Sequence, residues 1–155
     1  VKICNNMSLG ISMIAASETL MLAKRLKMDI KKVHQIVKEN GLNVVNSLDE
    51  LLSNSSVVIS MLPEGKHVQE LYLGENGILK KISQDSLIIE CSTIDIETSL
   101  KIGDHAKSLG IKMIDAPVTG GVMGARVGKL NFLVGGSQEA VKLATPLLKI
   151  FQINF

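Results

Sequence analysis

Apolar and polar positions alternate along the chain in two different patterns. Short apolar runs bounded by turn residues predict buried strands at 56–62, 86–91, 111–115 and 131–134, with a further strand beginning at 152–155. Apolar residues that recur every three or four positions predict helices at 8–27, 31–40, 64–73, 95–109 and 137–150. Short strands that alternate with longer helices indicate βαβ units, and therefore an α/β fold with a largely parallel sheet and flanking helices.

Capping and turn residues sharpen several of these boundaries. Ser47 and Glu50 have the spacing of a capping box, which predicts a short helix after residue 47. Either Ser92 or Asp95 caps the helix that Gly110 ends. The segment GENG at 74–77 predicts a turn.

Composition narrows the class of protein. With 155 residues, 46% of them hydrophobic and 21% charged, the chain has enough apolar material for one globular domain. A net charge of +2, with one Tyr, three Phe and no Trp, gives no reason to expect a nucleic-acid partner. The longest apolar stretch, 9–23, is too short and too polar to span a membrane. Two cysteines without a CxxC pair favour a reducing compartment.

Candidate chemistry gathers where the predicted parallel strands end, because ligands of open α/β sheets bind beyond the carboxyl ends of the strands. Three segments fall at that edge: 61–63, 91–93 and 115–121. Hydroxyl groups there are expected to point into one crevice, and two glycines let backbone N–H groups approach a carboxylate or phosphate closely: Ser92, Thr93, Thr119, Gly120 and Gly121. The alternative is that these segments are ordinary turns after strands.

The remaining polar candidates are weaker. Lys2 and Asn6 lie four residues apart, which places an ammonium and an amide on one face of a helix. A lysine in an apolar cleft can act as a general acid or base, whereas an isolated lysine near a terminus is usually solvated. The three histidines fall on separate predicted helices without a pattern of metal ligands, so no metal site is predicted. His67 follows Pro63 by four residues and lies near the expected crevice.

Three segments of the chain, MLP (61–63), ECSTID (90–95) and DAPVTGGVMGARVGKLNFLVGG (115–136), resemble the 3-hydroxyisobutyrate dehydrogenase family of β-hydroxyacid dehydrogenases. The resemblance runs from about residue 38 to 155 and implies a Rossmann-like domain, incomplete relative to the family, that binds NAD, with NADP not excluded. The residues it assigns to the substrate carboxylate are Thr119, Gly120 and Gly121. Those it assigns to the nicotinamide are Leu62, Pro63 and Thr93, with His67 beside them.

Residues 1–37 resemble a different part of the same family. The segment VKICNNMSLGISM is similar to the start of the helix that opens the family's second domain, which makes Lys2 the catalytic lysine and Asn6 a substrate-binding residue. In the family this helix follows the nucleotide-binding domain, whereas here it precedes it. Alternatively, VKIC is the opening strand, in which case the glycine-rich phosphate loop keeps only Gly10 of its three glycines and Asp29 falls near the place of the ribose-binding acid.

The function that the resemblance implies is hydride transfer from a 3-hydroxyacid to NAD(P), with Lys2 taking the hydroxyl proton and valine catabolism as its setting. It also implies a cytoplasmic or mitochondrial-matrix location and leaves a homo-oligomer open, since the family's helical second domain builds a dimer. Two alternatives remain. The chain is a catalytically inactive remnant or rearranged fragment that acts as a folded binding module, or a small flavodoxin-like binding domain.

Overall fold

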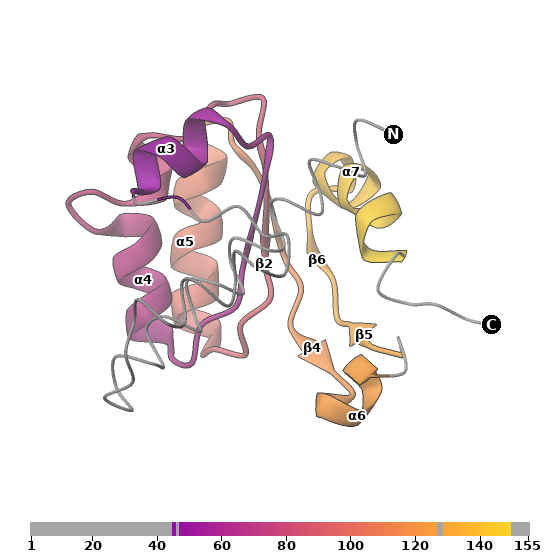
Figure 1. The fold of residues 1–155 in the computed structure, drawn as a ribbon. Helices are drawn as coiled ribbons and strands as arrows, with labels where there is room; N and C mark the ends of the chain where they lie inside the picture. Colours follow the sequence, from indigo (N-terminus) through magenta and orange to yellow (C-terminus); the bar gives the residue numbers. More distant parts are fainter. Residues whose placement is uncertain (1–44, 46, 127–128, 150–155) are drawn as a thin grey trace.

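A four-stranded sheet runs through the part of the chain that the computed structural model describes, namely residues 45, 47–126 and 129–149 (Figure 1). Its strand order is β1-β2-β3-β6. The first three strands are parallel and β6 is antiparallel to β3. The strands are β1 (Val57–Ser60), β2 (Leu87–Glu90), β3 (Lys112–Asp115) and β6 (Gly135–Gly136). The predicted α/β fold with a largely parallel sheet is therefore confirmed.

Helices cover both faces of this sheet, with α3, α4 and α5 on one side and α7 on the other (Figure 1). Their bounds are α3 (Leu48–Ser53), α4 (Gly65–Leu73), α5 (Ile96–Ser108) and α7 (Gln138–Leu148). In β2, Ile88 packs into the first apolar cluster, while Leu87 and Ile89 pack into the second. Burial on both faces explains why this strand is a continuous apolar run in the sequence.

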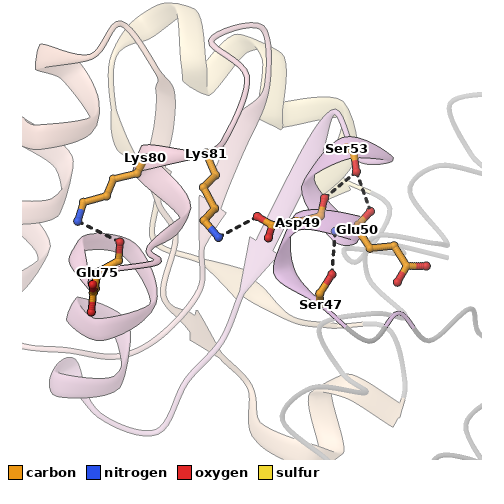
Figure 2. Close-up of polar contacts among 7 residues, drawn as sticks. All are labelled: Ser47, Asp49, Glu50, Ser53, Glu75, Lys80 and Lys81. Atoms are coloured by element: carbon orange, nitrogen blue, oxygen red, sulfur yellow. Dashed lines mark hydrogen bonds and ion pairs between the residues drawn. The ribbon is translucent and has the colours of Figure 1, made fainter.

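The helix boundaries follow the capping residues. Ser47 Oγ accepts a hydrogen bond of 3.1 Å from Glu50 N at the start of α3 (Figure 2). Asp95, not Ser92, caps α5, since its carboxylate accepts from Thr98 N at 2.8 Å. Ser137 caps α7 through Ala140 N. These local signals predict where the helices begin, because each hydrogen bond joins residues only three apart.

The turn at 74–77 is also present, and it leads into a single 3-10 turn, η1 (Ile78–Lys80), that the sequence did not predict. Lys80 Nζ donates to Glu75 O at 3.2 Å, and Lys81 forms an ion pair of 2.8 Å with Asp49 of α3 (Figure 2). The Lys80 bond lies within the connection between α4 and β2, and the Lys81 ion pair joins that connection to α3. Within the described ranges, no helix has the length and apolar character needed to cross a membrane.

The prediction of a strand at 131–134 is correct for residues 131–132 and wrong for residues 133–134. The structure instead has two strands of two residues, β5 (Asn131–Phe132), which pairs with β4 (Val118–Thr119), and β6, which pairs with β3. Gly136 has a φ of 150°, and a β-carbon there would lie 3.1 Å from Met113 O. The glycines thus let this segment approach β3 closely, which an apolar pattern alone does not reveal. The helices predicted at 8–27 and 31–40 and the strand at 152–155 lie outside the described residues.

Candidate functional site

The carboxyl ends of the three parallel strands form one edge of the sheet, and their last residues are polar. Ser60 pairs with Glu90, and Glu90 pairs with Asp115, so the three residues form a row across the strands. The segments 61–63, 91–93 and 116–121 follow directly after this row. The sequence prediction that these segments share one edge of the sheet is therefore confirmed, and this is the edge where α/β sheets bind ligands.

The residues predicted to line a nicotinamide lie on the first two segments and on α4. Leu62 is partly buried, whereas Pro63 and Thr93 are exposed. His67 is partly buried in the first turn of α4, where its backbone N–H donates to Glu64 O at 3.0 Å. Leu62, Pro63 and Thr93 offer apolar groups and a hydroxyl group, the kinds of group that contact a planar heterocycle carrying an amide, and their role at a nicotinamide remains a prediction.

The residues predicted to hold a carboxylate lie on the third segment. Thr119 ends β4 and is exposed. Gly120 and Gly121 follow with φ values of 113° and 58°, in a region that favours glycine, and α6 (Gly121–Arg126) begins there. Gly124 N donates to Gly120 O at 2.9 Å, which folds this glycine-rich segment into the short helix that the sequence did not predict. Lys2 and Asn6 lie outside the described residues, so their roles remain predictions.

The expectation that the Ser92 hydroxyl points into a ligand crevice is wrong. Ser92 is only 1% exposed, and its Oγ accepts a hydrogen bond of 2.6 Å from Leu62 N. Its own N–H donates to Glu90 Oε1 at 2.6 Å. The hydroxyl group and the backbone N–H of Ser92 thus bind the protein itself, because the residue lies two positions after a strand whose side chains are buried on both faces.

A buried polar cluster behind this edge was missed in the sequence. Its members are Ser60, Tyr72, Glu90 and Ser92, each of them at most 2% exposed. Ser60 Oγ donates to Glu90 Oε2, and it lies 2.5 Å from Tyr72 Oη. The available signal was the glutamate at the end of the apolar run SLIIEC, because a buried carboxyl group needs hydrogen-bond donors around it.

Burial dominates the electrostatics of this cluster. It raises the pKa of the Glu90 carboxyl, against the opposing effect of the hydrogen bonds from Ser60 and Ser92. Burial, followed by the Glu90 charge, raises the pKa of Tyr72 well above its ordinary value. Burial, with the charges of Glu90 and Asp115, raises the pKa of the Cys91 thiol to about 12. Burial also raises the pKa of Asp115, which a hydrogen bond with Ser99 opposes.

We expect the raised pKa of Glu90 to make the protein less stable as the pH rises above 4.5, the ordinary value for this group. In that range the folded chain retains a proton that the unfolded chain has released, so the free energy of unfolding falls with increasing pH. Tyr72 and Cys91 stay protonated in this range because the pKa of each is raised, and Asp115 contributes a slope of the same sign. Glu90→Gln removes the Glu90 part of this slope.

Urea unfolding of the wild type and Glu90→Gln from about pH 4 to about pH 8 measures this difference. The wild type loses stability relative to the variant as the pH rises. Parallel pH profiles for the two proteins would show that Glu90 titrates alike in the folded and unfolded chains.

The parallel sheet with helices on both faces and polar segments at its carboxyl edge defines a Rossmann-like, dinucleotide-binding α/β domain. A sequence profile of the NAD-binding domain of 6-phosphogluconate dehydrogenase matches residues 7–152. The chain belongs to this family of NAD(P)-binding domains and, within it, to the dehydrogenases related to 3-hydroxyisobutyrate dehydrogenase. The resemblance found in its motifs is therefore confirmed.

Individual relatives show how much of such an enzyme is present. The 3-hydroxyisobutyrate dehydrogenase of Pseudomonas aeruginosa is 45% identical over 111 residues, which are 72% of this chain and 37% of that protein. The Mycobacterium tuberculosis 3-hydroxyisobutyrate dehydrogenase, solved with L-serine, is 32% identical with a TM-score of 0.70 over 79% of this chain and 41% of that one. Psf3 in complex with NADP+ and 2-OPP is 27% identical with a TM-score of 0.73, covering 79% and 43%. The chain thus spans about two fifths of the length of these relatives.

Proposed function

We propose that this chain works as an NAD(P)-dependent dehydrogenase of 3-hydroxyacids, with 3-hydroxyisobutyrate as the substrate and valine catabolism as the setting. The observation that carries this proposal is the meeting of segments 61–63, 91–93 and 116–121 at the carboxyl edge of one parallel sheet. L-Serine, present with the mycobacterial relative, is also a 3-hydroxyacid, so the shared feature of the substrates is a hydroxyl group on the carbon β to a carboxylate.

The substrate and the cofactor each have their own set of residues in this proposal. Thr119 and the backbone N–H groups of Gly120 and Gly121 hold the carboxylate, because an exposed hydroxyl and glycines at positive φ leave the backbone accessible to an anion. Leu62, Pro63 and Thr93, with His67 beside them, orient the nicotinamide. NAD(P), when bound, supplies the hydride acceptor.

Lys2 takes the hydroxyl proton in this mechanism. A hydride leaves the carbon that bears the hydroxyl group for NAD(P), and a carbonyl group forms at that carbon. Asn6 orients the substrate next to it. The division of the chain into a segment at 1–37, similar to the start of the family's helical domain, and a nucleotide-binding part at 38–155 belongs to the same proposal. We place the protein, alone or as a homo-oligomer, in the cytoplasm or the mitochondrial matrix, where the buried free thiol of Cys91 stays reduced.

A second candidate function is that of a folded binding module without turnover. It is favoured by the exposure of Pro63, Thr93 and Thr119 at the carboxyl edge of the sheet. Catalysis in a cleft depends on excluding water, whereas these three side chains are open to solvent. Binding of a dinucleotide or hydroxyacid without oxidation of the acid is the behaviour expected of such a module.

Titration of the full chain with NADH and NADPH, followed by nicotinamide fluorescence, tests the proposal. We expect saturable binding of at least one of the two cofactors. With 3-hydroxyisobutyrate and the oxidised cofactor we expect turnover, which Lys2→Ala abolishes without weakening the binding of NADH. Lys101→Ala, which removes an exposed lysine on α5, is the matched control and keeps full turnover. Binding without turnover would favour the binding module, and a folded chain that binds neither cofactor would refute the dehydrogenase.

A further inference from the structure

Ser92, which Glu90 holds by its backbone N–H, connects two segments of the chain that the backbone ladder does not reach. The ladder between β1 and β2 extends to the bond from Cys91 N to Ser60 O, at 2.7 Å. Beyond it, the link passes through side chains. Glu90 Oε1 accepts from Ser92 N, and Ser92 Oγ accepts from Leu62 N, each at 2.6 Å. The segment after β1 and the segment after β2 are therefore tied together by the Ser92 hydroxyl group, and the Glu90 carboxyl group holds the backbone of Ser92 in place.

The second carboxyl oxygen of Glu90 anchors this link to the interior. Ser60 Oγ lies within hydrogen-bond distance of both Glu90 Oε2 and Tyr72 Oη, so it joins the carboxyl group to the tyrosine hydroxyl group. Tyr72 is fully buried in α4 and packs in the apolar cluster between the helices and the sheet. The carboxyl group is thus held from α4 and β1 on one side, and it holds the Ser92 backbone on the other.

A buried ionisable group destabilises the folded chain relative to an apolar group in the same space. Burying a carboxyl group carries a free-energy penalty that hydrogen bonds only partly offset, and an apolar side chain of the same volume would avoid it. The raised pKa of Glu90 agrees with such a penalty. What an apolar residue could not do is accept the Ser92 N–H and so fix the course of the chain toward Thr93.

We infer that Glu90 is a positioning residue, which fixes the segment 61–63 against the segment 91–93 and so sets the spacing of the residues that line the nicotinamide. The part of this inference that concerns the nicotinamide rests on the proposed function. The part that concerns the two segments rests on the hydrogen bonds alone. Ser92 is the second residue of this hydrogen-bonded link, because its hydroxyl group accepts the hydrogen bond from Leu62 N.

A pair of neutral substitutions of similar length separates hydrogen bonding from charge and volume. In Glu90→Gln, the amide oxygen still accepts from Ser92 N, and the amide N–H donates to Ser60 Oγ, which turns its own proton to Tyr72. In Glu90→Met, the side chain fills the same space but offers only a weak sulfur acceptor. A difference between these two variants measures the effect of the hydrogen bonds that residue 90 forms.

The first measurement is amide hydrogen exchange at Leu62 and Ser92 in the full chain, each rate divided by that of Ile89 in β2 to correct for global stability. We expect Glu90→Met to raise both relative rates about tenfold, the size expected for the loss of one hydrogen bond, and Glu90→Gln to leave them within about threefold. Ser92→Ala raises the relative rate at Leu62 and leaves that at Ser92 unchanged. Ser137→Ala, which removes the cap of α7, changes neither.

The second measurement is the dissociation constant for NADH. We expect it to rise about tenfold in Glu90→Met and to recover in Glu90→Gln. Unchanged relative exchange in Glu90→Met, or equal effects of Met and Gln, would overturn the inference. If Glu90→Met does not fold, Ser92→Ala decides by its effect at Leu62. If the wild-type chain binds no NADH but the variants show the expected exchange rates, the proposed function is refuted and the positioning role is supported.

Discussion

Replacing Gly77 by alanine is expected to lower the free energy of unfolding by about 3 kcal/mol, the upper end of the usual cost of overpacking. Gly77 has a φ of −67°, which any residue adopts, so backbone conformation is not the obstacle. The obstacle is space, since a β-carbon there would lie 2.5 Å from Tyr72 O and 2.7 Å from Tyr72 C. Backbone atoms of α4 would have to move, and Tyr72 belongs to the buried cluster behind the candidate site.

Gly103 provides the matched control for this substitution. It lies within α5, and a β-carbon added there would meet no atom within 4 Å. Since alanine is favoured over glycine in a helix interior by roughly 1 kcal/mol, Gly103→Ala is expected to raise the free energy of unfolding. Urea unfolding followed by circular dichroism measures both effects. Two changes of the same sign and size would show that the crowding at Gly77 does not exist in solution.

The elements of the fold that the sequence predicted well are those fixed by neighbouring residues. Ser47, Asp95 and Ser137 each cap a helix through a backbone N–H three residues away. The strands β1, β2 and β3 follow from apolar runs that any buried parallel strand requires. From these the α/β class and the edge where the three polar segments meet could be inferred, because parallel strands end on the same side.

The features that the sequence did not reveal depend on pairing between distant residues. Glu90 lies 30 residues from Ser60, and the two meet only because Ser60 and Glu90 are partners in the register of β1 and β2. Ser92 was misjudged for the same reason, since its donor, Leu62, comes from another strand end. The short strands β4 and β6, which the sequence did not predict, have two residues each, too few for any periodicity to show.

Gly120→Ala is expected to cost about 3 kcal/mol, at the upper end of the range for a strained backbone conformation. Gly120 has a φ of 113°, beyond the left-handed helical region that residues with a β-carbon occasionally adopt. A β-carbon there would also lie 3.1 Å from Lys129 O and 3.5 Å from Leu130 Cδ2. The alanine therefore meets a conformational and a steric obstacle together, and the segment between β4 and α6 must shift.

Gly121→Ala is the comparison variant, because both obstacles are smaller there. Gly121 has a φ of 58°, within the left-handed region, and a β-carbon added there meets nothing within 4 Å. Its expected cost is about 1 kcal/mol, that of the left-handed conformation alone. Urea unfolding ranks the two variants, and equal costs would contradict the close approach of Lys129. If these glycines hold the substrate carboxylate, as proposed, Gly120→Ala also raises the KM for 3-hydroxyisobutyrate more than Gly121→Ala does, because only the former displaces the backbone N–H groups.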